Sequence, residues 1–132
     1  MRNIIIACSS KFYEEVLNLK IELEEKGYNV LNYPKKINID TEYKNAYENF
    51  YKDIEKTDDF LLFNLDKNGV EGYIGYESFA EMSYLVANNI LTNNNDRKIF
   101  IYKMPDKKVG CYMEIEQFLK LGYIELYKNN LN

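Results

Sequence analysis

Short apolar runs alternate along this chain with longer segments in which apolar residues recur every three or four positions. The run IIIA at residues 4–7 is continuous, which is typical of a strand that a parallel sheet buries on both faces. Residues 11–26, in contrast, place an apolar residue on each helical turn, as an amphipathic helix does. Together, the two patterns predict five strands, at residues 3–7, 28–32, 60–65, 98–102 and 123–127, and four helices, at residues 11–26, 41–56, 76–88 and 114–121. A polar tail, residues 128–132, follows the last strand.

Strands that alternate with helices predict an α/β domain with a parallel sheet and helices on both of its faces. A chain of 132 residues has the length of one domain, so we expect a single domain over residues 1–132. The predicted architecture is a flavodoxin-like or Rossmann-like three-layer α/β/α sandwich, with five parallel strands in the order 2-1-3-4-5. Its ligand crevice would lie beyond the first and third strands, between residues 8–11 and 64–76.

Two glutamates in the predicted third helix are candidates for chemistry. Glu77 and Glu81 are four residues apart, so both can project from one side of the helix, where like charges are mildly unfavourable. Ser78 lies three residues before Glu81 and shares that side. The alternative, which the spacing alone leaves open, is that both glutamates are simply solvated at the protein surface. The apolar neighbours of Glu81 and its position just after a glycine-containing loop favour a functional role.

Polar and aromatic side chains are also expected at the carboxyl edge of the third strand. Asn64 and Asp66 follow that strand and are placed to contact a ligand. Tyr73 and Tyr76, on the loop before the third helix, can stack on a planar base or donate a hydrogen bond. Packing within the loop is the alternative for both tyrosines.

The turn after the first strand, Ser9-Ser10-Lys11, is a candidate anion site. Free N–H groups at a helix start favour a phosphate, and hydroxyls with a lysine suit the same role. The alternative is that one serine only caps the helix. The turn is not a P-loop, because it lacks the glycines.

The composition narrows the possible chemistry. The chain has no histidine, which excludes Ser-His and Cys-His catalysis. Because it also lacks a CxxC pair, a zinc site is not expected. Acid-base work would fall to carboxylates, tyrosines, lysines or cysteine, and no metal or cofactor is expected. A net charge of -4 argues against nucleic-acid binding. No apolar run approaches the ~18 residues of a membrane span, and the unpaired cysteines suit a reducing cytoplasm.

Three further expectations concern residues outside these motifs. Cys8 adjoins a buried strand, so we expect it to be part of the core rather than a nucleophile. Lys35 and Lys36 are expected to be solvated. Asp58 and Asp59 precede the third strand, so they are expected at its amino edge, away from the crevice, as a surface turn.

The segment FNLDKNGVEGYIGYESFAEMSYLVANN, residues 63–89, resembles the signature of nucleoside 2-deoxyribosyltransferase-like proteins. In that family an apolar strand ends in Asn or Asp and is followed by a loop and a Gly-Thr-x-x-Glu-like helix start. The first strand, the CSS turn and the segment KGYNVLNYP fit the family's first β-α-β unit, so the resemblance covers most of the chain.

The resemblance implies an enzyme that cleaves or transfers the deoxyribosyl group of nucleosides or their 5'-monophosphates. It implies that Glu81 is the nucleophile, that Ser78 occupies the threonine position, and that Ser9, Ser10 and Lys11 hold a 5'-phosphate. A second acid must protonate the departing base, and Asp66 is the candidate. The family also implies a homo-oligomer whose subunits complete each other's sites.

Two departures from the family favour an alternative function. The first strand has no tyrosine where the family often carries one, and the Asp-x-Gly-Thr signature is incomplete. The alternative is a non-catalytic nucleotide-binding module, either a sensor or a partner subunit. A third reading is a protein-interaction domain that uses the tyrosine-rich second helix.

Overall fold

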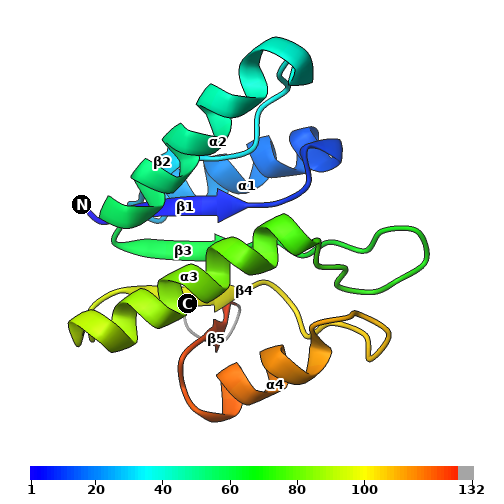
Figure 1. The fold of residues 1–132 in the computed structure, drawn as a ribbon. Helices are drawn as coiled ribbons and strands as arrows, with labels where there is room; N and C mark the ends of the chain where they lie inside the picture. The colour runs from blue at the N-terminus through cyan, green and yellow to red at the C-terminus, as the bar shows by residue number, and fades with distance from the viewer. Residues whose placement is uncertain (128–132) are drawn as a thin grey trace.

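The computed structural model describes residues 1–127 and confirms the predicted sheet (Figure 1). All pairings are parallel, and the strand order is β2-β1-β3-β4-β5. The strands are β1 (Asn3–Ala7), β2 (Asn29–Asn32), β3 (Asp59–Leu62), β4 (Lys98–Ile101) and β5 (Glu125–Leu126). The predicted polar tail, residues 128–132, lies outside the described residues.

The helices lie where the apolar periodicity predicted them, with shifted ends. They are η1 (Ser10–Phe12), α1 (Tyr13–Glu25), α2 (Ile39–Lys56), α3 (Tyr76–Thr92) and α4 (Tyr112–Lys120). The start of α2 is two residues earlier than predicted, because the Asn38 side chain caps it by accepting a 3.0 Å hydrogen bond from the Asp40 N–H. The end of α3 is four residues later, at Thr92, and its C-cap is Asn93, whose φ of 53° is the left-handed conformation that asparagine tolerates. No helix within residues 1–127 is both long and apolar enough to cross a membrane.

The sheet separates two apolar clusters, as a three-layer fold requires. Ile4, Ile5 and Ile6 are each 0% exposed and alternate between the two faces of the sheet. On one face they meet α1, through Val16, Leu19 and Leu23. On the other face they meet α2, α3 and α4, through Ile54, Met82, Leu85, Val86 and Ile115. The helices therefore hold β1 and β3 rigidly at the centre of the sheet.

Asp59 corrects one expectation, because it is buried rather than part of a surface turn. It lies at the amino edge of β3, away from the crevice as expected, but it is only 1% exposed. Its carboxylate accepts hydrogen bonds of 2.9 and 2.7 Å from Nε and Nη2 of Arg2. It also accepts a 3.0 Å bond from the Lys98 N–H of β4. This pair ties β1, β3 and β4 together, so its role is structural.

We expect Asp59→Ala to destabilise the fold by about 3 kcal/mol. The substitution leaves the Arg2 guanidinium and the Lys98 N–H without their buried acceptor, although Arg2 itself is partly exposed and can reach water. Thermal unfolding should show a Tm lower by roughly 10 °C. Asp96→Ala is the matched control, because Asp96 also pairs with Arg2 but its side chain is 80% exposed, so its loss should cost little. Equal losses for the two variants would contradict this role of Asp59.

Candidate functional site

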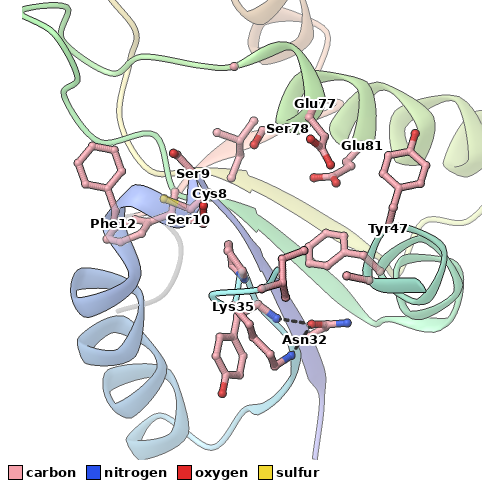
Figure 2. Close-up of a pocket in the computed structure, with 18 of the residues that line it drawn as sticks. Cys8, Ser9, Ser10, Phe12, Asn32, Lys35, Tyr47, Glu77, Ser78 and Glu81 are labelled. Atoms are coloured by element: carbon pink, nitrogen blue, oxygen red, sulfur yellow. Dashed lines mark hydrogen bonds between the residues drawn. The ribbon is translucent and has the colours of Figure 1, made fainter. Parts of the chain in front are cut away.

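A cleft of about 1110 Å³ opens at the carboxyl ends of β1 and β3, where the crevice is predicted. One side is formed by the turn after β1, and another by the end of the 63–75 loop and the first turns of α3. The third side is formed by the segment that follows β2 and by α2. Figure 2 shows the side chains that these elements direct toward the cleft. The volume matches the upper end of small-molecule sites, so the cleft can hold a ligand of nucleotide size.

Most of the predicted site residues meet in this cleft. Those that line it are Ser9, Ser10, Tyr73, Tyr76, Ser78 and Glu81. The other three, Lys11, Asn64 and Asp66, are not among the lining residues. The two loops predicted to face one another therefore do so, but the end of β3 lines the cleft with Leu62, Phe63 and Leu65 and not with its polar residues.

Glu81 is the buried acid of the cleft. It lies in the second turn of α3, is 6% exposed and lines the cleft wall. Burial raises the pKa of its carboxyl to about 8, and the charge of Glu77 adds to that rise. Within residues 1–127, no hydrogen bond to this carboxyl offsets its burial. Among the described residues, no fully buried side-chain polar atom is left without a hydrogen-bond partner, so the Glu81 carboxyl oxygens must reach the cleft. A largely buried acid that opens onto a cleft is a strong candidate for contact with a ligand.

Glu77 lies one turn before Glu81 and lines the same cleft, but it is exposed. The Tyr43 hydroxyl of α2 lies 3.3 Å from both of its carboxylate oxygens and donates to them. Figure 2 shows the side chains of Glu77 and Glu81 side by side on α3, on the side of the helix that faces α2. The two acids thus share one wall but differ in solvation.

Asn64 and Asp66 shape the loop instead of lining the cleft. Asn64 is buried and donates to the carbonyls of Gly72 (3.1 Å) and Lys103 (2.8 Å), while its Oδ1 accepts from the Lys103 N–H. Asp66 accepts 2.9 Å bonds from the Gly72 N–H and from Nζ of Lys103. The Lys103 hydrogen bond lowers the pKa of Asp66 first, and the Gly72 N–H lowers it further. A carboxyl with a lowered pKa is ionised near neutral pH and carries no proton to donate, so this geometry disfavours Asp66 as the second acid.

Gly72 allows the 63–75 loop to approach the loop that follows β4 closely. Its φ is +60°, which L side chains rarely adopt, and an added Cβ would lie 2.9 Å from the Cα of Pro105. The 63–75 loop therefore passes directly against the loop that follows β4, and the side chains of Asn64 and Asp66 fix it there.

The turn after β1 places its two serines in the cleft lining, as predicted, but not Lys11. Ser9 caps η1 by accepting from the Lys11 N–H at 3.3 Å. Ser10 is exposed and lines the cleft. Cys8 also lines the cleft, and burial raises the pKa of its thiol to about 12. The thiolate that a nucleophile requires is therefore suppressed, in agreement with the expectation that Cys8 is not the nucleophile.

The two loop tyrosines differ in their surroundings. Tyr73 is partly exposed, and Nζ of Lys67 lies 5.3 Å from the centre of its ring. Tyr76 is 92% exposed at the first position of α3. Both rings can reach a ligand in the cleft, and Tyr76 has the greater freedom to do so.

The third side of the cleft was missed by sequence reasoning. It comes from α2, which presents Tyr43, Tyr47 and Phe50, from Asn32 at the end of β2, and from Lys35 in the segment that follows. Lys35 is exposed as expected, yet it also lines the cleft, with its Nζ 2.9 Å from Oδ1 of Asn32. Partial burial lowers its pKa. The recurrence of tyrosine every four residues in α2 was the available signal, but periodicity does not say what a helix face meets.

The aromatic face of α2 is continuous with that of α3. The rings of Tyr43 and Tyr47 are 5.7 Å apart, those of Tyr47 and Tyr51 are 5.1 Å apart, and Tyr51 meets Tyr84 edge-on at 6.1 Å. Burial raises the pKa of Tyr51, and its hydrogen bond with Tyr47 and the charge of Glu81 raise it further. Two rings of this aromatic face, those of Tyr43 and Tyr47, line the cleft together with Glu81.

Comparisons with models of known protein families, with curated proteins and with solved structures find no match. Within residues 1–127, no three Cys, Asp or Glu side chains come together in a way that could hold a metal ion. The function must therefore be argued from the cleft and its side chains.

Proposed function

We propose that this protein binds a nucleoside or a nucleoside 5'-monophosphate in the cleft and breaks its N-glycosidic bond. The reaction is hydrolysis or transfer of the deoxyribosyl group, with Glu81 as the nucleophile. The observation that carries the proposal is Glu81 itself, a buried carboxyl on the cleft wall without a protein hydrogen bond. The resemblance of residues 63–89 to nucleoside 2-deoxyribosyltransferase-like proteins supports the same role for the same residue.

The side chains around Glu81 suit a nucleoside. A flat base can stack on the tyrosine rings of the cleft, of which Tyr47 and Tyr73 are examples. Ser9 and Ser10 lie at the start of η1, where their hydroxyls and backbone N–H groups can receive a 5'-phosphate. Lys35 adds a positive charge to the cleft.

The chemistry needs two proton-bearing or charged groups. Cleavage passes through an oxocarbenium-like state, which a carboxylate below the anomeric carbon stabilises or captures as a covalent intermediate. The departing base must also gain a proton unless it already carries a positive charge. Glu81 is proposed for the first task.

A chromatographic assay for free base tests the proposal. The purified protein would be incubated with deoxynucleosides and their 5'-monophosphates, with and without a second base as acceptor. Release of base without an acceptor indicates hydrolysis, and formation of a new nucleoside only with the acceptor indicates transfer. If no substrate in the panel yields base or exchanged product, the catalytic proposal is wrong.

A second candidate is a nucleotide-binding module without catalysis. It is favoured by Asp66, which the loop holds in its ionised form and away from the cleft lining. It predicts that a nucleotide at 100 times its Kd stabilises the fold by about 2.7 kcal/mol while no base is released. Thermal unfolding with and without each nucleotide separates this outcome from a protein-interaction domain, for which neither effect is expected. In either functional case, we propose that the protein acts in the cytoplasm and as a homo-oligomer.

A further inference from the structure

From the pairing of the two acids on α3, we infer that Glu77 is the acid-base partner of Glu81 and that the two carboxyls share one catalytic proton. This inference rests on the proposed glycosidic function and assigns the second acid, for which sequence reasoning chose Asp66.

The two acids lie on the same wall of the cleft. Glu77 and Glu81 both line the cleft and are four residues apart on α3. Residues at this spacing are neighbours on the helix surface, with Cβ atoms about 5–6 Å apart, so the two carboxyls can act on one substrate. Asp66 has no such position, because Lys103 and Gly72 hold it and it does not line the cleft.

The two acids differ in environment. Glu81 is 6% exposed and lacks a hydrogen bond from residues 1–127, whereas Glu77 is exposed and is oriented by the Tyr43 hydroxyl. Two neighbouring carboxyls in unlike surroundings do not ionise together, so one proton remains between them at neutral pH. Burial and the Glu77 charge both favour its residence on Glu81 in the free protein.

The other charged and titratable groups near the pair do not supply this proton. From α2, the pair faces Tyr43, Tyr47 and Tyr51, and the pKa values of Tyr43 and Tyr51 are raised. From the turn after β1 it faces Cys8, whose pKa is also raised. The cleft lining also includes Lys35, Lys52, Lys56 and Lys67, and Asp53, which pairs with Lys56. The raised pKa values keep Tyr43, Tyr51 and the Cys8 thiol neutral near pH 7.

The shared proton balances the first step. As substrate binds, the proton moves from Glu81 to Glu77. The Glu81 oxygen then forms a bond to the anomeric carbon, the carbon–nitrogen bond breaks with its electron pair going to the base, and Glu77 gives the proton to that base nitrogen. In the second step, water or the N–H of an acceptor base attacks the anomeric carbon, the ester bond to Glu81 breaks, and the attacking group's proton goes to Glu77. The pair then holds one proton again.

The test compares Glu77→Gln and Glu81→Gln on two substrates. The first is an ordinary purine deoxynucleoside, and the second carries an N7-alkyl group, so that its base is already cationic and leaves without protonation. Glu77→Gln should lower kcat/KM at least ~10²-fold on the first substrate but less than ~10-fold on the second. Glu81→Gln should lose turnover on both. Glu42→Gln is the matched control, because Glu42 is exposed on α2 and does not line the cleft.

The outcomes separate the two proposals. If the wild-type protein releases no base from either substrate, the glycosidic function and the role of Glu77 both fall. If the wild type is active and Glu77→Gln loses nothing, or loses both substrates equally, only the role of Glu77 is overturned.

A second measurement does not depend on turnover. Because the Glu77 charge raises the pKa of Glu81, Glu77→Gln should lower it, and an NMR titration of the glutamate carboxyl carbons reports this change directly. The same titration of Glu42→Gln should leave the pKa of Glu81 in place. An unchanged Glu81 pKa in Glu77→Gln would show that the two acids do not share a proton.

Discussion

Glu81→Gln should reduce turnover of a nucleoside substrate by at least ~10³-fold, the scale on which loss of a catalytic group acts. The amide has nearly the shape of the carboxyl, so it should still fit the buried position on α3. It cannot, however, form the covalent bond to the anomeric carbon or balance the charge of the oxocarbenium-like state. Steady-state kinetics of base release would measure the loss.

The control for this prediction is Glu114→Gln, which removes the same charge from the exposed first turn of α4, outside the cleft lining. It should leave kcat and KM unchanged. Substrate binding by Glu81→Gln, measured calorimetrically, should persist, because the base and phosphate contacts lie elsewhere in the cleft. Turnover of Glu81→Gln within a factor of ten of wild type would refute the nucleophile assignment.

The stability of wild-type protein, relative to Glu81→Gln, should fall by about 4 kcal/mol as the pH rises from 4 to 9. In the folded protein the pKa of Glu81 is about 8, whereas the ordinary value for glutamate is 4.5. Between these two values the folded state keeps a proton that the unfolded chain has released. Unfolding therefore releases a proton in this window, and raising the pH favours the unfolded state.

Denaturant unfolding of both proteins across this pH range would measure the effect. The two curves should lie close together near pH 4, where Glu81 is protonated in both states, and should separate until they become parallel above pH 8. Subtraction of the glutamine variant removes the contributions of all other titrating groups. A constant difference between the two proteins would mean that Glu81 titrates normally and is not desolvated.

The fold was predictable because its signals are local. A continuous run such as Ile4 to Ile6 fits a strand buried on both faces, and α1 repeats an apolar residue on every turn. The alternation of these two patterns leaves few topologies, and the observed strand order is the economical one. Only the ends of the elements differed, where single capping residues such as Asn38 and Asn93 decide them.

The candidate site was predictable in part. The serines after β1 and the first turns of α3 lie in the cleft because parallel strands bring their carboxyl ends to one edge of the sheet. The α2 wall was missed, because helical periodicity shows that a face exists but not which element it meets. Tyr43 and Glu77 are 34 residues apart in the chain, and nothing in either segment marks them as partners.

By itself, the sequence determined the order of elements, the edge of the sheet at which the cleft opens, and the spacing that places Glu77 and Glu81 on one side of a helix. These follow from backbone geometry within a few residues. The tertiary structure alone decided which acids are held by protein groups and which face the cleft. Arg2, 57 residues away, pairs with the buried carboxylate of Asp59, and Lys103 reaches Asp66 from 37 residues away. The charge state of a carboxyl depends on the partners and the solvent that surround it in the folded protein. Those partners come from distant segments, and nothing in the local sequence of either segment indicates that the two will meet.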